Sequence, residues 1–155
     1  MNRMDGLQAE ATRPDGKYDL AGRVIGLAMK VLPALGPGFV EPVYERAQQH
    51  ELTKAGIAFA AQVALKVHDD NVIVDDFVAD LLAGKSLLAE LKAVQALAAT
   101  HEVQLVNYLT ATGIEQGLLL SFGASRLKFR RKFRTYRPPA PHSCHSVHSV
   151  QPLPA

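Results

Sequence analysis

Apolar residues recur at helical spacing in the first third of the chain. They form a stripe with a period close to 3.6, which predicts a helix that begins after Asp19 as its cap. Pro33 should kink or end this helix near its last turn, because proline interrupts the hydrogen-bond ladder. A Gly-Pro-Gly turn follows at 36–38, and a second helix is predicted from Glu41 to Gly56. The apolar stripe of the first helix consists of Leu20, Val24, Leu27, Val31 and Leu35.

The pattern changes to a period of two in the middle of the chain. Residues 62–67 alternate between apolar and polar positions, which is typical of a strand. Turn-forming residues occupy 68–71, and a long β-rich run follows at 72–83. After a second turn at 84–86, residues 87–92 return as another strand. These three segments predict a meander of antiparallel strands.

A further helix, strand and basic segment complete the pattern. Residues 100–112 are predicted as a helix with Val103, Val106 and Leu109 facing inward, and residues 117–122 as a short buried strand. Residues 127–133 alternate apolar and basic side chains, as in a basic edge strand. The order α-α-β-β-β-α-β, with a final basic strand, predicts an α/β fold with a central sheet flanked by helices.

Length and composition indicate one folded domain and no membrane-spanning segment. The 155 residues suffice for one domain with its own core, and no apolar run is long enough to span a membrane. With a single cysteine and no apolar leader, the chain is expected in the cytoplasm. We expect a flexible leader at 1–18, one folded domain at 19–137 and a disordered tail rich in Pro, Ser and His at 138–155.

Charge is distributed unevenly along the sequence. The net charge is +2, but residues 126–137 contain seven basic residues and no acid, so removing them leaves −5 for the rest. A basic stretch on an acidic body predicts an anionic partner, and a solvated charged edge is the alternative that charge patterning leaves open. The six basic residues of this stretch that we assign to nucleic-acid contact are Arg126, Lys128, Arg130, Arg131, Lys132 and Arg134.

Two carboxylates and a lysine fall around the turn at 84–86. Glu90 and Lys92 are two apart in a strand and share a face, and Asp80 lies about as far before the turn as Glu90 lies after it. Antiparallel pairing should bring the two acids together. Such a group suits Mg²⁺ or Mn²⁺ and the hydrolysis of phosphate esters. A salt bridge on a half-exposed sheet would have the same spacing.

Two helical features could add to this site. Gln104 and Tyr108 are four apart and share a helix face, where an amide and a phenol could position a phosphate or a water. Glu41 lies in the first turn of the second predicted helix. The alternatives are a polar outer face for the first pair and compensation of the helix dipole for Glu41.

These residues together resemble a known family. The segment 38–44, Gly-Phe-Val-Glu-Pro-Val-Tyr, matches the motif of the GxxExxY proteins, small bacterial members of the PD-(D/E)XK nuclease superfamily. Further segments match in the family's order, from about residue 20 to 135. They are 35–38, Glu51-Leu52 with Gly56, 78–82, 89–93, 104–109 and 117–123.

The resemblance implies a restriction-endonuclease-like core, with a mixed sheet flanked by helices, and it assigns roles to the candidate residues. Asp80 and Glu90 look like the metal-binding acids, and Lys92 looks like the lysine of the signature. Glu41 looks like the extra acid that the first helices of such folds contribute. Gln104 and Tyr108 are similar to the glutamine–tyrosine motif of RecB-type exonucleases. One departure is that Leu32-Pro33 stands where the family usually has a histidine before the Leu-Gly-Pro-Gly turn.

The resemblance therefore implies an enzyme that hydrolyses phosphodiester bonds, with DNA favoured over RNA and Mg²⁺ or Mn²⁺ as the cofactor. Glu41, Asp80 and Glu90 would bind the metal, and Tyr108 and the basic stretch would contact nucleic acid. A non-catalytic nucleic-acid-binding or protein-interaction module is the alternative, for example an accessory subunit in DNA repair or defence. A homodimer or an accessory protein partner is compatible with either function.

Overall fold

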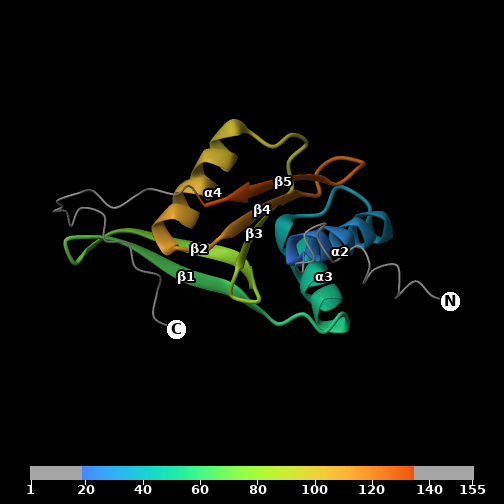
Figure 1. Ribbon diagram of the computed structural model, residues 1–155. Coiled ribbons are helices and arrows are strands. Elements are labelled where there is room, and N and C mark those ends of the chain that lie inside the picture. The colour runs from blue at the N-terminus through green and yellow to red at the C-terminus, as the bar shows by residue number, and fades with distance from the viewer. Residues whose placement is uncertain (1–18, 135–155) are drawn as a thin grey trace.

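A five-stranded mixed sheet forms the centre of the fold in the computed structural model, which describes residues 19–134 (Figure 1). Two helices precede the sheet and a third connects its strands, as the sequence predicts. The expected leader at 1–18 and tail at 138–155 lie outside the described residues. The elements are α2 (Leu20–Leu35), α3 (Glu41–Lys54), β1 (Phe59–Asp69), β2 (Val72–Ala83), β3 (Leu87–Lys92), α4 (Ala99–Thr112), β4 (Gln116–Ser121) and β5 (Lys128–Phe133).

The strands lie in chain order across the sheet. β1, β2 and β3 pair antiparallel, as expected for the meander, although β1 begins three residues before the predicted start at Gln62. β3 and β4 pair in parallel and are connected through α4, and β5 returns antiparallel to β4. The predicted α/β fold with a mixed sheet flanked by helices is therefore confirmed.

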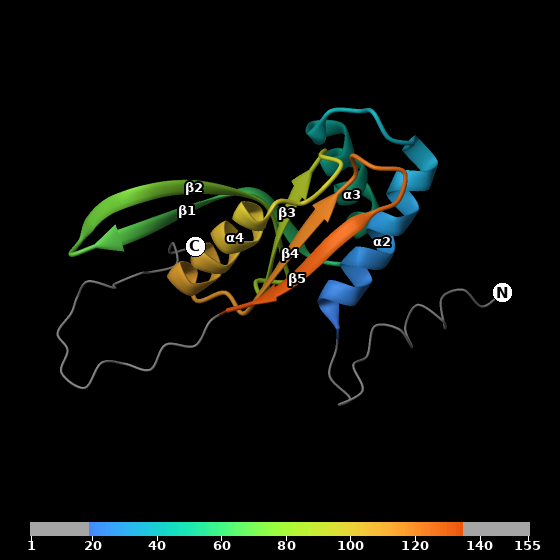
Figure 2. The ribbon, with the colours of Figure 1, turned by 90° about the horizontal axis from the view of Figure 1, so that it is seen from above.

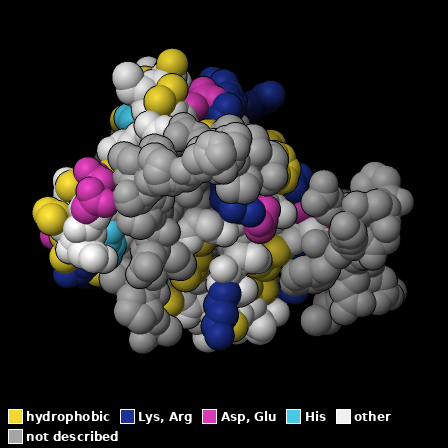
Figure 3. Space-filling view, turned by 60° about the vertical axis from the view of Figure 1, so that its left-hand side comes forward, with side chains coloured by type: hydrophobic (Ala, Val, Ile, Leu, Met, Phe, Trp, Pro, Cys, Tyr) yellow, Lys and Arg dark blue, Asp and Glu magenta, His cyan; other side chains and the backbone are white. Residues whose placement is uncertain are grey.

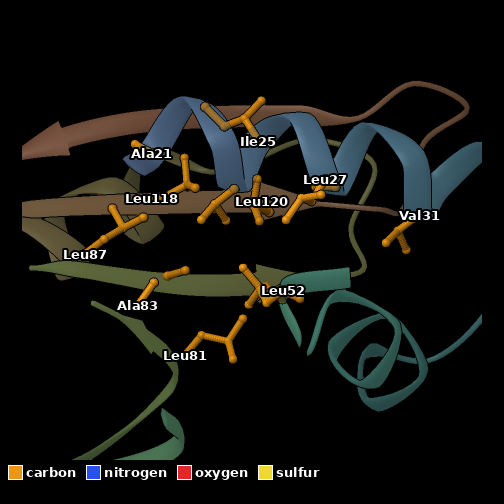
Figure 4. Packing of buried hydrophobic residues seen from close by; sticks show 14 of the residues in the cluster. Ala21, Ile25, Leu27, Val31, Leu52, Leu81, Ala83, Leu87, Leu118 and Leu120 are labelled. Atoms are coloured by element: carbon orange, nitrogen blue, oxygen red, sulfur yellow. The ribbon is translucent and has the colours of Figure 1, made fainter. Parts of the chain in front are cut away.

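One face of the sheet is covered by α2 and α3. Asp19 caps α2, its side chain accepting a hydrogen bond from the Gly22 N–H, and the helix ends at Leu35, two residues after Pro33. Figure 4 shows Leu118 and Leu120 of β4 beneath α2, with Leu52 of α3 closing the side. We call this cluster the first core, and its other members include Tyr44, Leu81, Ala83, Leu87, Ala89, Leu91 and Phe122.

The opposite face is covered by α4, which creates a second core. Its helical members, Leu105 and Leu109, are buried. The expectation that Val103 faces inward is wrong, because its side chain is 60% exposed. Leu105, Leu109 and Thr112 form the buried stripe of i, i+4, i+7 spacing, and Val103 lies outside it. The sheet residues of the second core are Leu65, Ala79, Leu88 and Leu119.

The outer two strands rotate where they leave the body of the sheet. Residues two apart in a strand normally share a face, yet Ala79 packs in the second core and Leu81 in the first. β1 also changes face, since Phe59 packs on the first core and Val63, four residues later, packs on the second. The change occurs at Gln62, whose φ of 53° is left-handed. Beyond this point the two strands project as a two-stranded arm, residues 63–79, which is plain in Figure 2.

No helix within residues 19–134 is long and apolar enough to cross a membrane.

Candidate functional site

Asp80 and Glu90 lie where β2 and β3 separate. The two strands pair from Ala83↔Leu87 to Leu81↔Ala89, and the same register places Asp80 opposite Glu90. At this position side-chain carboxylates, rather than backbone carbonyls, accept the hydrogen bonds of the backbone N–H groups. The N–H of Leu91 donates to Oδ2 of Asp80 at 2.8 Å, and the N–H of Asp80 donates to Oε1 of Glu90 at 3.2 Å. Both carboxylates therefore satisfy backbone donors in the fork between the strands.

Glu45 of α3 is a third acid in this fork, and the sequence prediction did not include it as a site residue. Its carboxyl group lies close enough to Asp80 for the negative charges of the two groups to repel each other. The amide of Gln62 donates to Oε1 of Glu45 at 2.8 Å. Acids from α3, β2 and β3 therefore lie together in the fork, and Gln62, the residue at which β1 changes face, contacts one of them.

The residue predicted for this position, Glu41, is more distant from the fork. It is exposed in the first turn of α3, one helical turn before Glu45, and its charge only adds to the repulsion that Glu45 feels. The i, i+4 spacing places both acids on one face of α3, which is the sequence signal that could have identified Glu45. The choice between them depends on how α3 rotates against the sheet.

Burial and mutual repulsion disfavour the ionised form of two of these acids. Burial first, and then the charge of Asp80, raise the pKa of Glu90 to about 8, and the Lys92 ammonium only partly opposes this. Burial and Asp80 likewise raise the pKa of Glu45 to about 7. At neutral pH the three-acid cluster therefore holds at least part of a proton that a free carboxylate would have lost. Strongly shifted carboxyl groups of this kind are common at functional sites.

Lys92, Gln104 and Tyr108 meet Glu90 on the side of the sheet that faces α4. The four side chains line one small pocket of about 10 Å³, about the room of a single water, together with Phe77, His101, Leu105 and Leu119. Gln104 and Tyr108 line this pocket together, so the predicted shared face of the pair is present. Period two in β3 explains why Glu90 and Lys92 open to the same side.

Tyr108 also fastens the arm to α4. Its ring stacks on Phe77 of β2 with centroids 3.7 Å apart, and its hydroxyl donates to Oδ2 of Asp75 at 3.0 Å. Burial and this hydrogen bond raise the pKa of the Tyr108 phenol, which keeps it a proton donor. The same residue thus reaches both the pocket beside Glu90 and the base of the arm.

Most of the predicted basic stretch is paired with acids of the same chain. Arg130 and Lys132 both pair with Glu102 of α4, Arg131 pairs with Asp19, and Arg134 pairs with Glu115. On the face in Figure 3, Lys and Arg side chains accordingly form several separate groups, some with Asp or Glu beside them.

The remaining two, Arg126 and Lys128, have no ion pair within residues 19–134. Lys128 lies opposite Ser121, which in turn lies opposite Lys92, so it is at the end of the sheet where the acids converge. The structure therefore separates the basic residues into four that pair with acids of the chain and two without an ion pair among the described residues, of which Lys128 lies two strands from Lys92.

The donor chemistry of the fork fits a hard divalent cation. Mg²⁺ takes carboxylate oxygens, needs only one or two of them, and keeps several waters. A cation would relieve the repulsion that raises the pKa of Glu45 and Glu90. Within residues 19–134, no group of three or more His, Cys, Asp or Glu side chains is placed so that it could hold a metal ion, so the fork offers a cation two carboxylates at most. Asp80 and Glu90 are the natural pair of ligands, with Glu45 in reach of Asp80.

Comparison with protein-family models gives a match over most of the chain. A family model described as the PD-(D/E)XK nuclease superfamily matches residues 18–132. This range contains every described helix and strand, except that β5 extends one residue beyond it. Neither the search of curated proteins nor the search of solved structures found a match. The matched range covers most of the chain and includes every acid of the fork, and the chain therefore belongs to the PD-(D/E)XK nuclease superfamily.

Proposed function

We propose that this protein is a metal-dependent nuclease that hydrolyses phosphodiester bonds, with DNA as the favoured substrate, and that it belongs to the GxxExxY group of its superfamily. The observation that carries the proposal is the convergence of Glu45, Asp80 and Glu90 in one fork, with raised pKa values for two of them. A purely structural role gives no reason to gather three acids where their charges repel.

The residues would divide the work as follows. Asp80 and Glu90, assisted by Glu45, would hold Mg²⁺ or Mn²⁺, which when bound makes water a better nucleophile and stabilises charge on phosphate. Lys92 would orient the attacking water or offset the negative charge that develops on the phosphate. Gln104 and Tyr108 would position the substrate from the other side of the pocket. Glu41 would act one turn away, by charge rather than by contact.

Phosphate contacts fall to the basic residues at the same end of the sheet. Lys128 and Arg126 are available for this, while Arg130, Arg131, Lys132 and Arg134 would have to exchange a carboxylate partner for a phosphate. Contacts of this kind do not read bases, so we expect little sequence preference.

The test needs isosteric variants. An alanine at position 80 would leave the Leu91 N–H without an acceptor and could unfold the fork, whereas Asp80→Asn and Glu90→Gln keep acceptor oxygens. We would titrate Mn²⁺ and Mg²⁺ calorimetrically into wild type and into the Asp80→Asn/Glu90→Gln double variant, and follow cleavage of labelled single- and double-stranded DNA. Lys92→Met should retain metal binding and lower the cleavage rate by about 10²- to 10³-fold, the usual cost of removing one charge-stabilising donor.

The matched control is Glu51→Gln, which removes an acid of the same helix as Glu45 that pairs with Lys54 outside the fork. Metal binding and cleavage that both disappear only in the double variant would support the proposal. A wild-type protein that binds DNA and no metal would overturn it in favour of a non-catalytic nucleic-acid-binding module. Metal binding without cleavage would instead favour an accessory subunit that requires a partner.

A further inference from the structure

The loop between α2 and α3 presents an aromatic ring to solvent. Phe39 is 47% exposed and Val40 beside it is 66% exposed. Two aromatic rings in the described part of the chain are largely exposed, Phe39 and Phe133, and they lie at different places in the fold. Single exposed apolar residues are ordinary on protein surfaces, so exposure alone gives Phe39 no function.

The loop is, however, held rigidly in this exposed conformation. The buried Tyr44 hydroxyl donates to the Gly36 carbonyl at 2.6 Å and accepts from the Phe39 N–H at 3.2 Å. Gly36 and Gly38 have φ values of 81° and 106°, which side chains with a Cβ rarely adopt. The ring of Tyr44 meets Phe39 edge-on, with centroids 6.2 Å apart. These restraints hold the backbone of the loop, and with it the position of Phe39, before any ligand binds.

The loop is connected by direct contacts to the end of the sheet that carries the site. Tyr44 stacks on Phe122 with centroids 4.8 Å apart, and the Phe122 N–H donates to the Lys92 carbonyl at 2.9 Å. Figure 2 shows the arrowheads of β3 and β4 pointing toward the connection between α2 and α3. Lys128, which has no ion pair among residues 19–134, lies opposite Ser121, the residue before Phe122. Phe39 and Lys128 thus lie around the same end of the sheet, on opposite faces. Phe122 packs in the first core under α2 and α3, whereas Lys128 shares with Ser121 and Lys92 the face toward α4.

We propose that Phe39 stacks on an unpaired nucleobase of a single-stranded nucleic acid whose backbone passes Lys128 on its way to the acidic fork. This inference rests on the proposed function and adds the substrate class. Proteins hold single strands with aromatic rings and cations together, since each base offers a face for stacking and each phosphate a charge. In a duplex those faces are already occupied by neighbouring bases, so the ring favours single strands or the frayed ends of duplexes.

The chain offers a direct optical test because it contains no tryptophan. Phe39→Trp places a single fluorophore at the proposed contact, and Phe133→Trp places one at a ring of similar exposure, 51%, at the opposite end of β5 from Lys128. Each variant would be titrated with a twelve-nucleotide single strand and with the matching blunt duplex, at low salt and in EDTA. We expect the single strand to quench Phe39→Trp fluorescence more strongly than the duplex does, and to leave Phe133→Trp unchanged.

Binding measured by anisotropy of a labelled single strand supplies the second readout. Phe39→Leu keeps an apolar side chain against Tyr44 but removes the ring, and it should weaken single-strand binding by about 5- to 150-fold, the range for loss of one stacked base. Phe39→Tyr should restore binding, and thermal unfolding of all variants would show that the fold is kept.

Equal quenching of both tryptophan variants, or unchanged binding by Phe39→Leu, would overturn the inference. The nuclease proposal is tested separately, by metal binding and cleavage. If Phe39→Trp fluorescence is quenched but the protein never cleaves nucleic acid, base stacking at Phe39 stands and the nuclease proposal fails. If Phe39→Leu cleaves and binds single strands with unchanged affinity, the nuclease proposal stands and base stacking at Phe39 fails.

Discussion

Asp80 has a structural task as well as its proposed chemical one. Its carboxylate replaces a strand partner for the Leu91 N–H, and Glu90 does the same for the Asp80 N–H. This explains how acids are retained in a partly buried fork: each is hydrogen-bonded to backbone, although their charges repel. The hydrogen bonds fix the positions of the carboxyl groups, and burial together with the repulsion favours the protonated forms of Glu90 and Glu45.

The raised pKa values predict that the metal-free protein is more stable in mild acid than in mild base. In the unfolded chain these glutamates titrate near 4.5, and in the folded chain near 7 and 8, so the folded state binds more protons between these limits. Their contribution is complete below about pH 4.5 and is lost as pH rises through 7 to 8. One such group changes the free energy of unfolding by about 1.4 kcal/mol per pH unit within its window, less where solvent screens it.

Urea unfolding between pH 5.5 and 8.5 checks this. Glu90→Gln should flatten the decline of stability with pH, and Glu45→Gln should flatten it less, since Glu45 has the smaller shift. Glu51→Gln is the control outside the cluster. Parallel slopes for Glu90→Gln and wild type would show that Glu90 is not the group that titrates.

At the scale of elements, the arm is the least supported part of the sheet. Beyond Gln62 and Asp80 it is a two-stranded ribbon, and such ribbons are marginally stable without further packing. Its outward side carries the exposed Val72, Val74 and Val78. Support comes from α4, through the stack of Phe77 on Tyr108 and the hydrogen bond from Tyr108 to Asp75. Helix α4 thus connects the arm to the pocket beside Glu90.

We therefore expect the amides of residues 63–79 to exchange hydrogen faster than those of β3 and β4, which have strands on both sides. Hydrogen–deuterium exchange with mass spectrometry measures this directly. Tyr108→Ala should accelerate exchange in the arm and leave β3 nearly unchanged, and Tyr108→Phe, which keeps the stack and loses the hydrogen bond, should fall between. Arm amides as protected as those of β3 would contradict this account.

For the whole molecule, the distribution of charge matters more than its sum. The basic stretch predicted as one nucleic-acid surface is largely neutralised by Glu102, Asp19 and Glu115, which attach β5 to α4 and to the neighbouring segments. Surface pairs of this kind add little stability, so their main effect is to reduce the field available to a polyanion. Of the six basic residues assigned to this stretch, Arg126 and Lys128 have no ion pair in the part of the chain that the structure describes.

Salt dependence of DNA binding should distinguish the two groups of cations. Lys128→Gln should reduce the slope of log K against log salt concentration by about 0.7 to 0.9, the value for one lost phosphate contact. Arg134→Gln, which removes a cation already paired with Glu115, should change it less. Filter binding between 50 and 300 mM salt, on the order of the physiological range, provides the slopes. Equal reductions in both variants would mean that β5 binds nucleic acid along its whole length.

How far the sequence alone reaches can be judged from particular residues. The register that sets Asp80 opposite Glu90 was predictable, because a strand has period two and the turn at 84–86 is short, so the pairing is local. The shared pocket face of Gln104 and Tyr108 follows from helical spacing in the same way. The inward position of Val103 was predicted wrongly, since two overlapping apolar stripes on one helix can only be separated by what packs against them.

By itself, the sequence determined the order of the elements and the meeting of Asp80, Glu90 and Lys92, because these depend on short-range periodicity and turn length. Only the tertiary structure decided that Glu45 reaches Asp80 while Glu41 stays outside the fork. It also decided that β1 and β2 change face at Gln62 and Asp80, and that Glu102 neutralises Arg130 and Lys132. Each of these is set by packing between residues far apart in the chain, which leaves no local signature in the sequence.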